Sequence, residues 1–184
     1  MARRLARLAL ILALAAGCSH ERPAATAEPY NATDVMFLQM SLEQITEGDQ
    51  VASLAEERAA DPRVRAIATE LRTQWKDESG TMRRWLLGWQ QPLTADPSAG
   101  AHAGHGALHA LRASDIEELR AARGGDFDRT AVSLLLGHLA NCVETSRMEQ
   151  SAGGYPPARS LATTATERRQ SQVRRLLTLA AAGG

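Results

Sequence analysis

Cysteine is scarce in this sequence, with only two residues in a chain of 184. Two cysteines cannot build the set of disulfides that stabilises many small exported domains. Aromatic residues make up only 4% of the chain, and acidic and basic residues balance at 21 each. Without an excess of positive charge, nucleic acid is not expected as a partner. Because the chain has too few cysteines for a set of disulfides, a hydrophobic core must stabilise the fold.

Sequence motifs of common enzymes are also missing. The chain has no glycine-rich phosphate loop, no nucleophile elbow, no Cys-x-x-Cys pair and no quartet of carboxylates of the oxidative ferritin kind. We therefore expect a protein that is not an enzyme.

The first seventeen residues have the pattern of a signal peptide. The basic residues Arg3, Arg4 and Arg7 precede an apolar run over 8–16, which is shorter than the roughly 20 residues that span a bilayer. Small residues directly precede Cys18. This resembles the lipobox of bacterial lipoproteins, in which the cysteine takes a diacylglycerol and becomes the new N-terminus. The alternatives are an ordinary secretory peptide cut near Ala16 and an uncleaved anchor.

A lipid on Cys18 predicts attachment to a membrane at the extracytoplasmic face of a bacterial cell. Without residues 1–17 the chain keeps 18 basic residues against 21 acidic ones, a net charge of −3. This charge gives no reason to expect contact with anionic lipid beyond the anchor. Residues 18–33 contain the lipidated cysteine and a segment rich in Ala, Pro, Glu and Thr, which we interpret as a flexible tether.

Helical periodicity dominates the remaining chain, 34–182, which we expect to form one all-α domain. Helix-start signals are the pair Thr33-Asp34, Asp61-Pro62 and a capping box over 114–117. They predict long helices over about 33–60, from 62 to about 90, 126–152 and 156–182, and a short helix over 114–124. The apolar stripe of the second helix contains Val64, Ile67, Leu71, Trp75, Met82, Trp85 and Trp89, predicted to be core. Charge-rich segments such as 167–169 are predicted to be solvated faces.

The two halves of this region align at a constant offset of 94 residues. Pro62 falls on Pro156, Arg65 on Arg159, and similar pairs continue along the helices. One hairpin cannot bury its apolar face alone, but two packed hairpins can. The sequence therefore predicts a four-helix bundle with a pseudo-two-fold axis, built from hairpins 34–90 and 126–182 and a linker, 91–125. Residues 34–87 should superpose on 128–181 after a half-turn.

Three segments, 31–40, 61–68 and 125–129, resemble the ferritin-like family called domain of unknown function 305. The resemblance covers about 30–180. It implies an exported helical bundle, often a lipoprotein, and for some members a link to copper. The family's paired histidines fall here on Gln44-Ile45 and His138-Leu139, so one histidine of four is present. Its methionine-rich linker stretch is absent.

The repeat offset selects four polar positions, one in each long helix. Gln44 falls on His138, and Glu78, which matches a glutamate of the family, falls on Gln172. Four inward-pointing polar side chains can build a metal site in a bundle, but two neutral amides are poor ligands for copper or zinc. The alternative is a polar layer in which imidazole pairs with carboxylate and each amide with a neighbour. Cys142 lies one helical turn beyond His138. It could add a soft metal ligand, or it could be a small core residue.

A second candidate metal site is the linker, where His102, His105 and His109 occur within eight residues. Exposed neutral imidazoles bind Cu(II) and Zn(II), although a histidine-rich linker can also bind metal without specificity. Two function classes therefore stay open: a copper-binding accessory protein, or a non-catalytic envelope protein that has lost the family's metal site. The sequence does not identify a protein partner.

Overall fold

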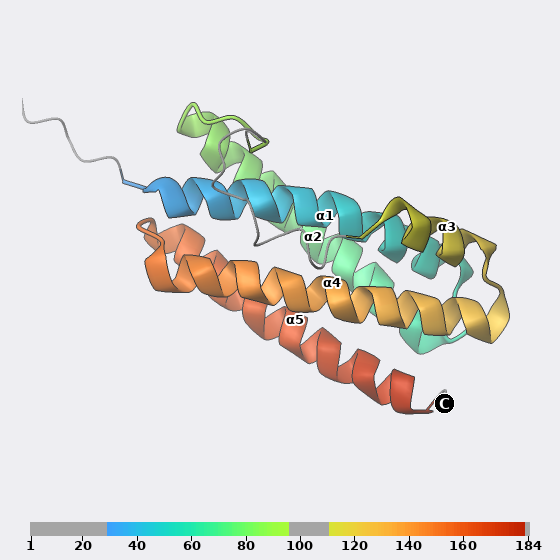
Figure 1. Cartoon of the computed structure of the whole chain (residues 1–184). Helices are drawn as coiled ribbons and strands as arrows, with labels where there is room; N and C mark the ends of the chain where they lie inside the picture. The colour runs from blue at the N-terminus through green and yellow to red at the C-terminus, as the bar shows by residue number, and fades with distance from the viewer. Residues whose placement is uncertain (1–28, 96–110, 183–184) are drawn as a thin grey trace, which may run out of the picture.

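The computed structural model describes residues 29–95 and 111–182, which form five helices (Figure 1). These are α1 (Ala32–Arg58), α2 (Pro62–Gly88), α3 (Ala113–Ala121), α4 (Gly124–Ala152) and α5 (Pro156–Ala182). No strand occurs within these ranges, so the all-α prediction is confirmed. None of the described helices is both long and apolar enough to cross a membrane. Cys18 and the three linker histidines lie outside the described residues.

Two hairpins, α1–α2 and α4–α5, pack through their first helices. α1 and α4 run side by side along the molecule, and α3 covers one end of that pair (Figure 1). The backbones of α2 and α5 make far fewer close approaches to each other than those of α1 and α4. The bundle predicted from the repeat is therefore present, and its hairpins pack much more closely through their first helices than through their second helices.

Most helix bounds agree with the prediction, but two start signals are different. Asn31, not the Thr33-Asp34 pair, caps α1, because its side-chain oxygen accepts the N–H groups of Thr33 at 2.8 Å and Asp34 at 3.2 Å. The predicted box over 114–117 is also wrong. α3 starts earlier, where the Asp115 carboxylate accepts the backbone N–H of Arg112 at 3.0 Å. In both helices an aspartate three residues after the cap accepts the backbone N–H of the cap residue, and in α1 the Asn31 side chain completes the box.

The core consists of two hydrophobic clusters along the bundle axis. The larger cluster includes Leu71, Trp75 and Leu139, and the smaller one includes Phe37 and Met82. Polar positions of all four long helices lie between them. The predicted stripe of α2 is buried through Met82, whereas its last two tryptophans, at 85 and 89, are half-buried.

Those two tryptophans belong to an aromatic cluster at one end of the bundle. Tyr30 stacks on Trp89 with ring centroids 4.1 Å apart. Tyr155 contacts Trp85 and Trp89 edge-on at 5.4 and 5.1 Å. We call this end, formed by the start of α1, the end of α2 and the α4–α5 turn, the aromatic end. The opposite end contains the α1–α2 turn, α3, the start of α4 and the end of α5.

Reciprocal contacts between the hairpins follow the repeat. The carboxylate of Asp34, in the first turn of α1, accepts the N–H groups of residues 154 and 155 at 3.0 and 2.8 Å. The carboxylate of Asp128, in the first turn of α4, accepts those of residues 60 and 61 at 2.9 and 2.7 Å. Donors and acceptors are related by the offset of 94. The first helix of each hairpin thus holds the turn of the other, as a pseudo-two-fold axis requires.

Glu149 breaks this symmetry, because its repeat position is Ala55. It is fully buried, and no N–H or hydroxyl donor reaches either carboxylate oxygen. Its neighbour is Asp34, whose pKa is held below its ordinary value by backbone N–H groups, against the effect of burial. Burial, together with the hydrogen bond and charge of Asp34, raises the pKa of Glu149 to about 8. Glu149 is therefore protonated at neutral pH and donates to Asp34.

Replacement of Glu149 by glutamine should change how stability depends on pH. In the wild type the folded state retains a proton that the unfolded glutamate loses near its ordinary pKa of 4.5, so Glu149 lowers the free energy of unfolding as pH rises from 4.5 to about 8. Glutamine donates to Asp34 at every pH. Urea unfolding between about pH 6.5 and 8.5 should show a fall for the wild type and little fall for the variant. Equal slopes would contradict the shared proton.

Candidate functional site

The four polar residues selected by the repeat lie in one buried layer between the two hydrophobic clusters. Gln44, Glu78, His138 and Gln172 are at most 7% exposed, one on each long helix. Within 29–95 and 111–182, no three His, Cys, Asp or Glu side chains are grouped to hold a metal ion. The layer is thus present, and its chemistry depends on which neighbours its members contact.

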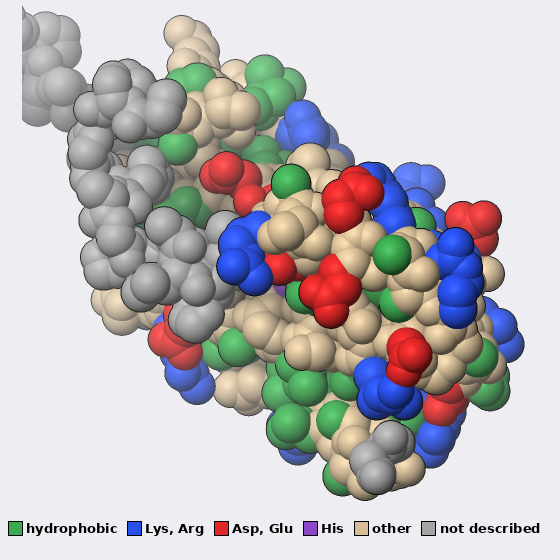
Figure 2. All heavy atoms as spheres, turned by 45° about the vertical axis from the view of Figure 1, so that its right-hand side comes forward, with side chains coloured by type: hydrophobic (Ala, Val, Ile, Leu, Met, Phe, Trp, Pro, Cys, Tyr) green, Lys and Arg blue, Asp and Glu red, His purple; other side chains and the backbone are tan. Residues whose placement is uncertain are grey.

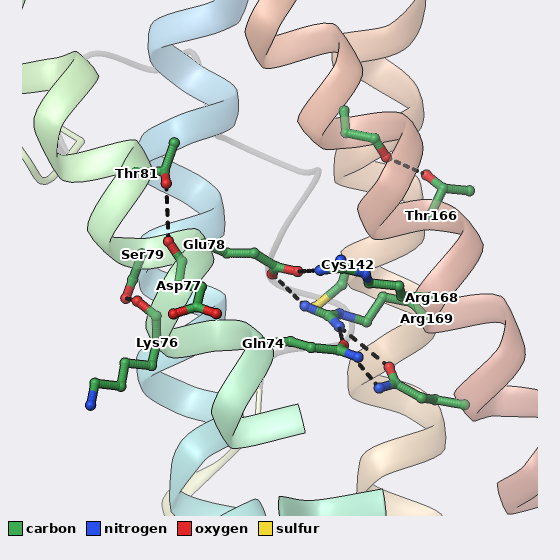
Figure 3. Close-up of polar contacts among 12 residues, drawn as sticks. Gln74, Lys76, Asp77, Glu78, Ser79, Thr81, Cys142, Thr166, Arg168 and Arg169 are labelled. Atoms are coloured by element: carbon green, nitrogen blue, oxygen red, sulfur yellow. Dashed lines mark hydrogen bonds and ion pairs between the residues drawn. The ribbon is translucent and has the colours of Figure 1, made fainter. Parts of the chain in front are cut away.

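Arg169 is the dominant residue of this layer, and sequence reasoning missed it. Its side chain is only 2% exposed, so the prediction that 167–169 is a solvated face is wrong at this position. Its guanidinium donates to Glu78 at 2.5 Å and to Gln74 at 2.7 Å (Figure 3), and its central carbon lies 5.6 Å from the centroid of the Trp75 ring. A signal existed: the offset of 94 places Arg169 on the core position Trp75.

Glu78 is the counter-ion of this guanidinium. Burial raises the pKa of Glu78, and the positive charges of Arg169 and of Arg168, whose Nη1 lies 3.7 Å away, oppose that rise. Because arginine stays protonated, a carboxylate in contact with it at 2.5 Å is ionised at neutral pH. The pair leaves Glu78 no free negative charge for a metal.

His138 does not pair with Glu78, so that part of the predicted polar layer is wrong. Its Nε2 lies 3.6 Å from the Cys142 sulfur, and its ring meets Trp75 edge-on with centroids 5.9 Å apart. Burial and the charge of Arg169 lower the pKa of His138 to about 4, against a weaker opposing effect of the Gln44 carbonyl. Nδ1 of His138 has no hydrogen-bond partner. The imidazole is neutral.

The two glutamines satisfy their amide groups within the layer, as predicted. Gln44 donates to the Thr145 hydroxyl at 2.8 Å. Gln172 donates to Glu70 and Gln74, both at 3.0 Å. An unpaired buried amide would cost about 1–3 kcal/mol, and these contacts avoid that cost for both glutamines without a ligand.

Side chains of the layer also connect α2 and α5, whose backbones make few close approaches. Arg169 and Gln172 of α5 contact α2 as described, and Arg175 donates to Glu70 at 2.6 Å further along. These contacts form a polar ladder between α2 and α5. Long polar side chains thus join the second helices of the two hairpins.

This donor set does not fit a divalent metal at the bundle centre. A divalent ion would lie beside the Arg169 guanidinium and would have to displace it from Glu78. The remaining donors are a neutral imidazole and the Cys142 thiol, whose pKa burial raises to about 12. The free space in the layer, bordered by Met82 and Cys142, is about 20 Å³, room for no more than about one water. The centre therefore holds a fixed guanidinium in place of a metal.

Gly48 provides the room that the imidazole needs. A β-carbon at this position would lie 2.4 Å from His138 Nε2 and 2.7 Å from the Trp75 ring. At offset 94 its counterpart is Cys142, so the side chain missing from α1 makes space for those on α4 and α2. Close packing in this layer thus depends on glycine at position 48.

We expect Gly48→Ala to destabilise the bundle by about 1–3 kcal/mol, because a well-packed core does not absorb an extra methyl group. The matched control is Gly137→Ala in α4, where a β-carbon meets nothing within 4 Å. That variant should gain about 0.5–1 kcal/mol from helix propensity. Urea denaturation at neutral pH measures both. Equal stabilities of the two variants would show that the imidazole is not tightly packed against α1.

Comparisons with known proteins place this fold in one family. The family model described as Domain of unknown function (DUF305) matches residues 34–180. A secreted DUF305 protein from Streptomyces coelicolor superposes with a TM-score of 0.75 at 19% identity, covering 83% of this chain and 92% of that one. A DUF305 fragment from Deinococcus radiodurans gives 0.72 at 19% identity, with 84% and 99% covered.

CopM in its Cu(II)-bound form superposes with a TM-score of 0.68 at 19% identity, covering 80% of this chain and 95% of that one. No curated protein matches the sequence. At these identities the structural likeness establishes the fold, whereas the family's sequence pattern matches most of the chain. The chain belongs to the DUF305 family.

Proposed function

We propose that this chain is a lipid-anchored accessory protein of the bacterial cell envelope, on the extracytoplasmic side, which binds copper and catalyses no reaction. Its family membership and its structural likeness to a protein solved with Cu(II), Cu(I) and silver support the metal. The apolar run ending at Cys18 supports the anchor, and the secreted Streptomyces neighbour supports export.

Copper binds in the linker in this proposal, and Arg169 is the observation that favours this location. A bundle whose central carboxylate already neutralises a guanidinium attracts a metal cation only weakly. His102, His105 and His109 offer three imidazoles that can be hydrated until they bind. Because closing a linker around an ion costs ordering entropy, the affinity should be modest.

The second candidate is a non-catalytic envelope protein that has lost the family's metal site. The same ion pair favours it, because Arg169 neutralises Glu78 and both glutamine amides are hydrogen-bonded with no metal present. In this case the bundle would act through its surface. The two candidates differ in whether the wild-type protein binds copper at all.

A copper titration of four proteins tests the proposal: the wild type, His102/His105/His109→Ala, His138→Ala and Cys142→Ser. The triple variant should lose binding, and the two central variants should bind as the wild type does. Wild-type affinity should fall as pH drops through about 6.5, since protonated imidazole does not ligate. Loss of binding in the central variants alone would place the site at His138 and Cys142. A wild type that binds no copper would support the second candidate.

The anchor is tested separately by labelled palmitate. Label should enter the wild-type chain and not Cys18→Ala, which should become soluble or retain its signal peptide. Equal labelling of both chains would contradict lipidation of Cys18.

A further inference from the structure

The aromatic end concentrates residue types that the rest of the molecule has little of. The chain contains three tryptophans and two tyrosines, and both tyrosines and two of the tryptophans lie there, in mutual contact. Trp85 and Trp89 are only half-buried, and Leu87, at the same level of α2 but on its outer face, is 62% exposed. Tryptophan and tyrosine favour the interface between membrane and water, where a ring can be partly apolar and partly wet.

Among the residues that the structure describes, exposed charge at this end has a single sign. Within about two helical turns of the aromatic end, the described charged side chains that reach solvent are Arg83, Arg84, Arg147 and Arg159, whereas the described acidic residues there, Asp34 and Glu149, are buried. Arg147 pairs with Glu144, just outside these turns. The other three form no salt bridge with a described residue. This local charge is complementary to an anionic surface, although the mature chain as a whole is slightly acidic.

The repeat shows that the fold does not require this composition. At an offset of 94, Tyr155 corresponds to Asp61, Trp85 to Leu179 and Arg83 to Leu177. The opposite end, which comes forward in Figure 2, has acidic and basic side chains interspersed, including the pairs Arg63–Asp61 and Arg129–Asp126. Equivalent positions of the same fold are thus neither aromatic nor uniformly basic.

The chain enters the bundle at the aromatic end (Figure 1). Eleven residue steps separate Cys18 from Pro29, the first described residue, and such a segment spans at most about 40 Å. An anchor at the N-terminus would therefore keep this end within about 40 Å of the lipid.

We propose that the aromatic end docks on an anionic phospholipid surface, with Trp85, Trp89 and Leu87 at the level of the headgroups and the arginines against lipid phosphates. This inference rests on the proposed attachment of the N-terminus to a membrane. It revises the expectation, drawn from net charge, that lipid contact ends at the anchor. Docking sets the bundle upright, with the opposite end and α3 directed away from the membrane.

Tryptophan fluorescence of the lipidated chain in vesicles tests the docking. The vesicles contain phosphatidylcholine brominated near the headgroup end of its acyl chains, with or without phosphatidylglycerol. Wild-type fluorescence should be quenched, and Trp85→Phe/Trp89→Phe, which retains only the buried Trp75, should not be. Arg83→Gln/Arg84→Gln should lose most of the quenching that phosphatidylglycerol adds. Circular dichroism verifies that each variant remains helical.

Two results would overturn the proposal: no quenching of the wild type, or equal quenching of the wild type and the double tryptophan variant. Quenching that does not respond to phosphatidylglycerol would overturn the anionic preference. A chain starting at residue 18, with Cys18→Ser and an N-terminal hexahistidine tag on nickel-chelating lipid, repeats the test without the native lipid. If palmitate labelling fails but this tethered chain is quenched, the lipid anchor is wrong and the docking surface stands. If labelling succeeds and quenching is absent, the docking surface is wrong and the anchor stands.

Discussion

The buried guanidinium of Arg169 is the constraint on which the centre of this bundle depends. A charge removed from water must be paired and hydrogen-bonded, or the fold loses several kcal/mol. Here Glu78 neutralises it, Gln74 accepts a second hydrogen bond, and the Trp75 ring covers its face. These partners all belong to α2, so satisfying one charge on α5 also joins the second helices of the two hairpins, whose backbones make few close approaches.

Positions related by the repeat have become complementary rather than identical at this level of the bundle. Trp75 and Arg169 are repeat counterparts, and they contact each other across the axis. Gly48, the counterpart of Cys142, leaves the space into which His138 packs. A symmetric bundle would have the same side chain at both positions of each repeat pair. Here the Trp75 ring faces the Arg169 guanidinium, and Gly48, which has no side chain, faces the His138 imidazole. The symmetry is retained at the ends, where Asp34 and Asp128 hold equivalent turns.

The sequence predicted the architecture well because the signals for helices are local and the repeat is nearly free of gaps. Apolar periodicity and Asp61-Pro62 located the long helices, and the offset of 94 located the polar layer. Which side chains of that layer pair with each other was harder to predict from the sequence. Arg168 and Arg169 are adjacent and chemically identical, so only their position relative to the core separates an exposed residue from a buried one. The caps at Asn31 and Arg112 were missed because the nearby Thr33 and Ser114 are common capping types, and because Arg112 caps α3 without a hydrogen bond to its side chain.

If Arg169 stands in for a metal, then Arg169 and Glu78 must be strongly coupled, and a double-mutant cycle in urea measures this most directly. Arg169→Met should cost about 3–5 kcal/mol, because it leaves Glu78 buried without its counter-ion. Adding Glu78→Leu should restore most of that loss, since a hydrophobic pair of similar volume can replace a buried ion pair. An Arg169→Met protein within about 1 kcal/mol of the wild type, or single effects that simply add, would contradict a bundle centre organised by this charge.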